Sequence, residues 1–272
     1  MRALAYVTAT AQDNAHSNPD EAARKQGQAF AELMIPVVKG WSTESAVDIA
    51  SLGVQVHGGM GYIEETGAAQ HLRDARNTTI YEGSTAIQAN DLIGRKIARE
   101  KGVTINAIIA DMRAAADQLD GDLAMIGARQ KVAVDALEKA VFWIVENFSA
   151  EPKATHAGAV PFLHLLGITA GGWQMGRAAV IARSKVAAGD SDPFWSAKLA
   201  TARFFADHFL TQVPGLAEFV LAGGAGAHPA KLAGCGPHGS GAARGAVGGD
   251  SVHRGALHHA GADHHGRAHA AC

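Results

Sequence analysis

The sequence predicts an all-α protein, with one helical bundle followed by a second helical bundle and a disordered tail. Apolar residues recur at helical spacing through most of residues 1–221, and no segment alternates as a half-buried strand does. Short connections rich in glycine, proline and aspartate separate the helical segments, as in antiparallel bundles. Residues 222–272 are mostly Gly, Ala and His, a composition that cannot bury enough apolar surface to offset chain entropy.

The first predicted bundle covers residues 1–101. Its first long helical segment contains Pro36, which predicts a bend or an end there. Ser42 or Thr43 can cap the next helix, which we expect to stop at the paired glycines Gly58 and Gly59.

The remainder of this bundle is less regular. We expect a loop-like segment over residues 60–83 that contains a short helix around 67–76. A further helix is predicted to begin at about Ser84, because apolar residues recur from there on one stripe.

The second predicted bundle covers residues 104–221. Apolar residues follow helical spacing in three segments, and Asp192-Pro193 then predicts a cap with proline at the first position of the last helix. No repeat relates the two bundles.

Composition excludes several classes of function. Apolar residues make up 47% of the chain and charged residues 18%, with a net charge of -2 and no basic block, so we expect no nucleic-acid binding. No run reaches the roughly 18 apolar residues of a membrane span. Two cysteines, Cys235 and Cys272, favour a reducing cytoplasm over a secreted disulfide scaffold.

The first residues resemble the middle of an amphipathic helix, so we expect a missing N-terminal part.

The histidines of the predicted tail allow a metal site, but their context argues against one. Eight of the 14 histidines lie there, including the pair His258-His259. A metal site needs a fixed shell of ligands, and nothing in this segment fixes one. Disorder explains the segment better, as does a reading-frame shift in GC-rich DNA, so we expect no metal site.

Two local features of the first bundle have both a structural and a functional interpretation. The glycines at 58, 59 and 61 can simply end a helix, or they can let a ligand approach the backbone. Glu82, between Tyr81 and Gly83, can be a surface carboxylate. Placed just before a helix, it can also be held partly desolvated, which makes a carboxylate a better general base near neutral pH.

Taken together, these motifs resemble the C-terminal helical domain of the acyl-CoA dehydrogenases over roughly residues 1–101. Several motifs recur in the family's order and spacing: Gln55-x-x-Gly58-Gly59-x-Gly61-Tyr62, Arg73-Asp74, and Ile80-Tyr81-Glu82-Gly83-Ser84-x-x-Ile87-Gln88. Residues 104–221 resemble the extra C-terminal helical domain of the longer members in length, position and pattern.

The resemblance implies an FAD-dependent α,β-dehydrogenation of an acyl-CoA thioester to a 2-enoyl-CoA. Glu82 matches the catalytic base, and its backbone N–H would serve the thioester carbonyl oxygen. Tyr81 and Gly83 match substrate-binding positions. An electron-transfer flavoprotein would accept the electrons, and the complete protein would be a homo-oligomer.

The resemblance also assigns cofactor-binding positions. Gln55, Gly58 and Gly59 match residues that contact FAD, typically that of a neighbouring subunit. Ser84 and Gln88 match positions on the adenine side. It implies a structural role for Arg73-Asp74, as an ion pair or loop anchor.

The sequence departs from the family's pattern, because we find in it no counterpart of the family's N-terminal helical domain or middle β-domain and expect both to be absent. The alternative function is therefore a non-catalytic helical remnant or interaction module without bound flavin. We expect little or no FAD on the chain alone, since a partial pocket leaves polar cofactor groups unpaired.

Overall fold

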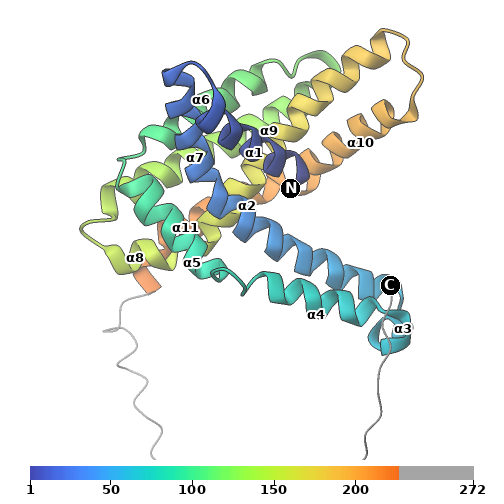
Figure 1. Cartoon of the computed structure of the whole chain (residues 1–272), viewed down its shortest axis with the longest axis horizontal. Helices are drawn as coiled ribbons and strands as arrows, with labels where there is room; N and C mark the ends of the chain where they lie inside the picture. Colours follow the sequence, from blue (N-terminus) through green and yellow to red (C-terminus); the bar gives the residue numbers. More distant parts are fainter. Residues whose placement is uncertain (227–272) are drawn as a thin grey trace, which may run out of the picture. The chain divides into compact units, whose positions relative to one another are not determined.

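The computed structural model describes residues 1–226, and this part is helical with no strand (Figure 1). The all-α prediction is confirmed. The larger helices are α1 (Arg2–Ser17), α2 (Glu21–Val56), α4 (Ala68–Thr78), α5 (Thr85–Asp91), α6 (Val103–Asp117), α7 (Ala124–Asn147), α9 (Ala159–Ala187), α10 (Pro193–His208) and α11 (Val213–Gly226). Shorter elements are α3 (Gly59–Tyr62), η1 (Glu64–Thr66), the π-helical η2 (Leu92–Ala98), η3 (Gly121–Leu123), α8 (Pro152–Ala157) and η4 (Leu210–Gln212).

Helix α2 is one continuous helix of 36 residues, so the predicted interruption is wrong. Pro36 lies inside it, and neither Ser42 nor Thr43 caps a new helix. The Thr43 hydroxyl instead donates to the Lys39 carbonyl within the helix, at 2.8 Å. Proline removes a single backbone donor, and the buried face on both sides of Pro36 keeps the helix in place.

The paired glycines end α2 as predicted. The helix stops at Val56, and Gly58 has a φ of +61°, which favours glycine. The following turn packs closely, because a Cβ on Gly61 would lie 2.2 Å from the Val54 carbonyl oxygen. Helix α4 then runs back beside α2, close to the predicted range 67–76 (Figure 1).

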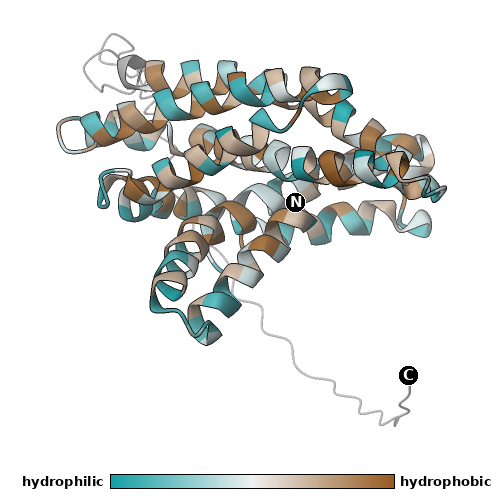
Figure 2. Ribbon diagram, turned by 90° about the horizontal axis from the view of Figure 1, so that it is seen from above, coloured by the Kyte–Doolittle hydropathy of each residue, from teal (hydrophilic) through white to brown (hydrophobic). Residues whose placement is uncertain are grey.

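One hydrophobic core joins helices from both predicted bundles. It contains residues of α2, α5, η2, α6, α7, α9 and α11. Helices α2 and α9 pack closely at Trp41, since Gly167 and Gly171 leave room for its indole ring. Hydrophobic and hydrophilic residues alternate along most helices in Figure 2, as amphipathic helices require.

The last part of the described chain contains a helix that the sequence analysis missed. Asp192 caps α10 by accepting from the Phe194 N–H at 2.9 Å, with Pro193 at the first position as predicted. After η4, α11 continues from Val213 to Gly226 and buries Val220. The predicted tail histidines and both cysteines lie beyond residue 226, outside the described residues.

Candidate active site

The candidate site centres on the turn between α4 and α5, residues 79–84. Its backbone is held at both ends, because the Tyr81 N–H donates to the Asn77 carbonyl at 3.0 Å and the Thr85 N–H to the Thr79 carbonyl at 3.2 Å. Between them, Glu82 has a φ of 55° and Gly83 a φ of 95°. A left-handed glutamate is uncommon, and such residues cluster at functional sites.

Two side chains hold the carbonyl groups of this turn. The Lys39 ammonium, from the middle of α2, donates to the Gly83 carbonyl oxygen. The Gln88 side-chain amide, from α5, donates to the Glu82 carbonyl oxygen at 3.3 Å. The turn is therefore tied to α2 on one side and to α5 on the other.

The start of α5 has its own tie to α2. The Thr85 hydroxyl donates to the Glu44 carboxylate at 2.5 Å, and the Arg76 guanidinium of α4 lies 3.8 Å from the same carboxylate. The sequence analysis missed Lys39 and Glu44. They stand 44 and 41 residues before their partners, and no local pattern links them.

The side chains expected to meet substrate are open in this part of the chain. Glu82 is exposed and Tyr81 is 67% exposed, so the expectation that local structure partly desolvates Glu82 is wrong. Gly83 and Ser84 are half-buried. Within residues 1–226, no backbone carbonyl accepts from the Glu82 N–H, which leaves that donor available for a ligand oxygen.

The predicted cofactor-binding residues at the end of α2 form a separate cluster. Gln55, Gly58 and Gly59 are all exposed. No heavy atom lies within 4 Å of a Cβ built on Gly58 or Gly59, so their backbone is open to a ligand. An exposed backbone and a side-chain amide can both serve polar groups of a ligand.

The structure does not bring this cluster together with Ser84 and Gln88. Glu44 of α2 contacts the start of α5, whereas Val54 contacts the turn at Gly61. These ten residues of helix span about 15 Å at 1.5 Å per residue. The predicted cofactor residues thus lie in two places, at opposite ends of α4 (Figure 1).

Arg73 anchors a loop, but its partner differs from the predicted one. Its guanidinium donates to both carboxylate oxygens of Glu64, at 2.9 and 2.7 Å, rather than to Asp74. The hydrogen bonds and charge of Arg73 lower the pKa of the Glu64 carboxyl, and Glu64 raises the pKa of Arg73. The pair ties η1 to α4.

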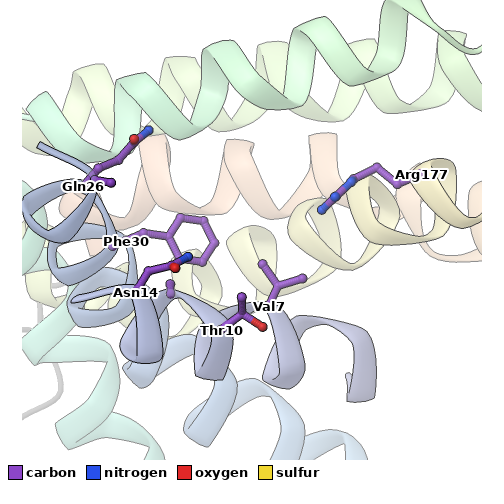
Figure 3. A pocket seen from close by; sticks show the side chains of 9 residues that line it. Val7, Thr10, Asn14, Gln26, Phe30 and Arg177 are labelled. Carbon is purple, nitrogen blue, oxygen red and sulfur yellow. The ribbon is translucent and has the colours of Figure 1, made fainter. Parts of the chain in front are cut away.

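Two clefts of the described chain lie away from Glu82. One of about 470 Å³ is lined by residues of α1, α2 and α9, among them Asn14, Phe30 and Arg177 (Figure 3). Another of about 520 Å³ lies beside Gly61 and Arg73. Within the described residues there is no cluster of three His, Cys, Asp or Glu side chains that could hold a metal, and no helix long and apolar enough to cross a membrane.

Two family models match the chain. Residues 1–97 match the acyl-CoA dehydrogenase C-terminal domain, and residues 104–228 match the acetyl-CoA dehydrogenase C-terminal-like domain.

Three relatives, each matched over about four-fifths of this chain, agree with the family models. A 3-methylmercaptopropionyl-CoA dehydrogenase of Ruegeria pomeroyi is 47% identical over 218 residues, which are 78% of this chain and 36% of the relative. The broad-specificity linear acyl-CoA dehydrogenase FadE5 of Mycobacterium tuberculosis is 32% identical over 81% of this chain and 38% of its own. A butyryl-CoA dehydrogenase of Syntrophomonas wolfei is 30% identical over 79% of this chain and 36% of its own.

The chain thus spans little more than a third of the length of these relatives. Both family models describe C-terminal domains, and the match over residues 1–97 includes the turn at Glu82. The chain therefore belongs to the acyl-CoA dehydrogenase family.

Proposed function

We propose that this chain is the C-terminal part of an FAD-dependent acyl-CoA dehydrogenase, in which Glu82 is the base that removes the α-proton of an acyl-CoA thioester. The product is a 2-enoyl-CoA, and an electron-transfer flavoprotein receives the electrons. The observation that carries this proposal is the left-handed Glu82, whose backbone N–H has no backbone acceptor in the described chain.

The chemistry requires both parts of Glu82. The α-proton of a thioester is weakly acidic, so the enolate that develops needs a hydrogen bond at its carbonyl oxygen. The Glu82 carboxylate takes the proton, and the Glu82 N–H donates to that oxygen. Bound FAD supplies the acceptor for the hydride that leaves the β-carbon. Two electrons and two hydrogens thus leave the substrate.

Gly83 and Tyr81 shape the space around the base. A side chain on Gly83 would lie 3.0 Å from the Gln88 amide nitrogen and would crowd the thioester, so glycine suits this position. Tyr81 lies beside the base with its ring 67% exposed, free to pack along the acyl chain or the flavin.

The two separate groups of cofactor residues suit a cofactor shared between subunits. Ser84 and Gln88 lie near Glu82 and contact the adenine side of FAD in this proposal. Gln55, Gly58 and Gly59 lie at and just beyond the end of α2, more than about 15 Å along this helix from Glu44, and contact the FAD of a neighbouring subunit. A homo-oligomer satisfies both sets of contacts at once.

Because Glu82 is exposed in this chain, the proposed reaction requires other parts of the enzyme to shield it from water. A base in water competes poorly for a weakly acidic proton, so substrate and the part of the enzyme that this chain does not span must exclude water from it. That part of the enzyme also supplies the acyl pocket in this proposal.

We assign residues 1–101 to the family's C-terminal helical domain and residues 104–221 to the additional helical domain of the longer members. The family-model matches to residues 1–97 and 104–228 support this division. We also propose a cytoplasmic location.

The exposed Glu82 also favours a second candidate, a helical module that binds no flavin and performs no catalysis. The absorbance spectrum of the purified chain separates the two in part. Stoichiometric flavin on the chain alone would exclude the second candidate, whereas its absence is compatible with both.

A fusion protein decides between them. The whole 272-residue chain is joined to the N-terminal part of the Ruegeria pomeroyi relative that it does not match, and acyl-CoA oxidation is followed with an artificial electron acceptor. We expect bound FAD and oxidation of acyl-CoA. A folded fusion that binds FAD and substrate without oxidising it would refute the proposed function.

A further inference from the structure

We infer that Lys39 is a positioning residue, whose ammonium holds the Gly83 carbonyl and thereby fixes the Glu82 backbone in the orientation that the reaction needs. This inference rests on the proposed function of Glu82. It starts from one contact, the hydrogen bond from the Lys39 Nζ to the Gly83 carbonyl oxygen across 44 residues of sequence.

Lys39 stands on a firmly placed segment of α2. Its neighbours Val37, Gly40 and Trp41 are buried, and a Cβ on Gly40 would lie 2.6 Å from a Leu163 methyl group of α9. Helix α2 therefore packs closely against α9 at this point. Lys39 thus reaches the turn from a closely packed segment of α2.

The turn at Glu82 and Gly83 needs a stabilising contact of this kind. Glu82 and Gly83 are successive left-handed residues, and the glutamate pays a steric penalty in that conformation that glycine does not. Hydrogen bonds from a charged donor are roughly twice as strong as neutral ones. Among the described residues, Lys39 is the charged donor to a carbonyl of this turn, and it acts on the carbonyl of Gly83, directly after the strained Glu82.

The other anchor near the site acts elsewhere. Glu44 accepts from Thr85 and so fixes the first residue of α5. Lys39 contacts the residue adjacent to the base itself. Among the described residues, no carboxylate forms an ion pair with Lys39, so the Gly83 carbonyl is the partner that its half-buried ammonium has.

This contact gives Lys39 a measurable effect on rate. The Glu82 carboxylate and N–H must both face the thioester, and a misplacement of about 1 Å in such a geometry can cost on the order of 100-fold in rate. Loss of the lysine lowers kcat, whereas KM changes little because Lys39 touches no substrate group.

The first test uses the fusion protein described above with Lys39→Met, Lys39→Arg and, as a matched control, Lys96→Met. Lys96 is also a half-buried lysine on the core, but it pairs with Glu32 at 3.2 Å, away from the turn. We expect kcat to fall at least roughly tenfold in Lys39→Met with KM within about twofold, and to recover in Lys39→Arg, which restores a charged donor. Lys96→Met keeps the parent kcat.

The second test uses the 272-residue chain alone and needs no activity. Amide hydrogen exchange is measured at Tyr81 and Thr85, whose N–H groups are hydrogen-bonded at the two ends of the turn. We expect Lys39→Met to speed exchange at both, with α7 and α9 unchanged, and Lys39→Arg to restore protection. Lys39→Gln replaces Lys39→Met in both tests if the latter does not fold.

The outcomes separate the two proposals. An unchanged kcat in Lys39→Met, beside a fusion that Glu82→Gln inactivates, overturns the role of Lys39 and leaves that of Glu82 standing. Full activity in Glu82→Gln overturns the role of Glu82 and, with it, the positioning of a base by Lys39. In that case faster exchange in Lys39→Met would support only the contact with the turn. A loss of kcat that arginine does not rescue also overturns the inference.

Discussion

Gly167 of α9 lies against the indole ring of Trp41 on α2, so closely that a Cβ on Gly167 would stand 2.3 Å from the Trp41 Cγ. This contact joins the helices of the two predicted bundles. Gly167→Ala forces one helix away from the other. We expect the free energy of unfolding, measured by urea denaturation, to fall by about 1–3 kcal/mol.

A matched glycine on α2 checks that explanation. No heavy atom lies within 4 Å of a Cβ built on Gly53, so Gly53→Ala adds a better helix former without a clash. Its free energy of unfolding should rise by about 0.5–1 kcal/mol. Equal effects of the two alanines would show that the contact with Trp41 is unimportant.

The turn after α2 offers a second pair of glycines. Gly61→Ala places a Cβ 2.2 Å from the Val54 carbonyl oxygen and should lower the free energy of unfolding by about 1–3 kcal/mol. Gly59→Ala meets no atom within 4 Å and should change it by less than about 0.5 kcal/mol. Circular dichroism during urea titration measures both, and a destabilising Gly59→Ala would contradict the open surface at that glycine.

The strain at Glu82 predicts a conflict between stability and function. Glycine adopts a φ of 55° without steric cost, so Glu82→Gly should raise the free energy of unfolding by about 1 kcal/mol. Glu65→Gly, in η1, should lower it by about 0.5–1 kcal/mol, because its backbone lies outside the left-handed region. Thermal unfolding of the two variants tests this, and a destabilised Glu82→Gly would mean that the turn is not strained.

His164 of α9 predicts how stability depends on pH. Burial lowers its pKa below the ordinary 6.5, although the negative charges of Glu44 and Asp48 oppose this shift. The unfolded chain therefore binds a proton more readily than the folded protein. The free energy of unfolding should fall as the pH drops from 6.5 toward the lower folded pKa.

Two variants test the His164 contribution in opposite directions. His164→Gln removes the titrating group and should flatten the pH dependence between about pH 7 and 5. Asp48→Asn removes a charge that favours the protonated imidazole, so the fall should continue to lower pH. Urea denaturation at a series of pH values measures both. A slope that persists in His164→Gln would place its origin elsewhere.

Local patterns in the sequence were enough to predict the helices and turns around the candidate site. The glycines at 58 and 59 end α2, a short helix forms at Ala68–Thr78, and α5 starts directly after Ser84. Each of these depends on residues a few positions apart, which is the range over which capping and periodicity act.

Features set by distant contacts could not be predicted in this way. Helix α2 continues past Pro36 because its buried face packs on α9 and α5, which outweighs a local helix-breaking signal. Lys39 and Glu44 reach the turn only once α2 lies beside it. The exposure of Glu82 likewise depends on what packs over the turn, and the sequence pattern around Glu82 contains no information about that.

The most direct test of the central claim is single-turnover reduction of the flavin in the fusion protein after rapid mixing with acyl-CoA. Glu82→Gln keeps the size and the backbone N–H but removes the base, so reduction should slow at least about 1,000-fold. Glu65→Gln, an exposed glutamate on η1, should reduce the flavin at the parent rate. Flavin reduction in Glu82→Gln at the parent rate would contradict the account.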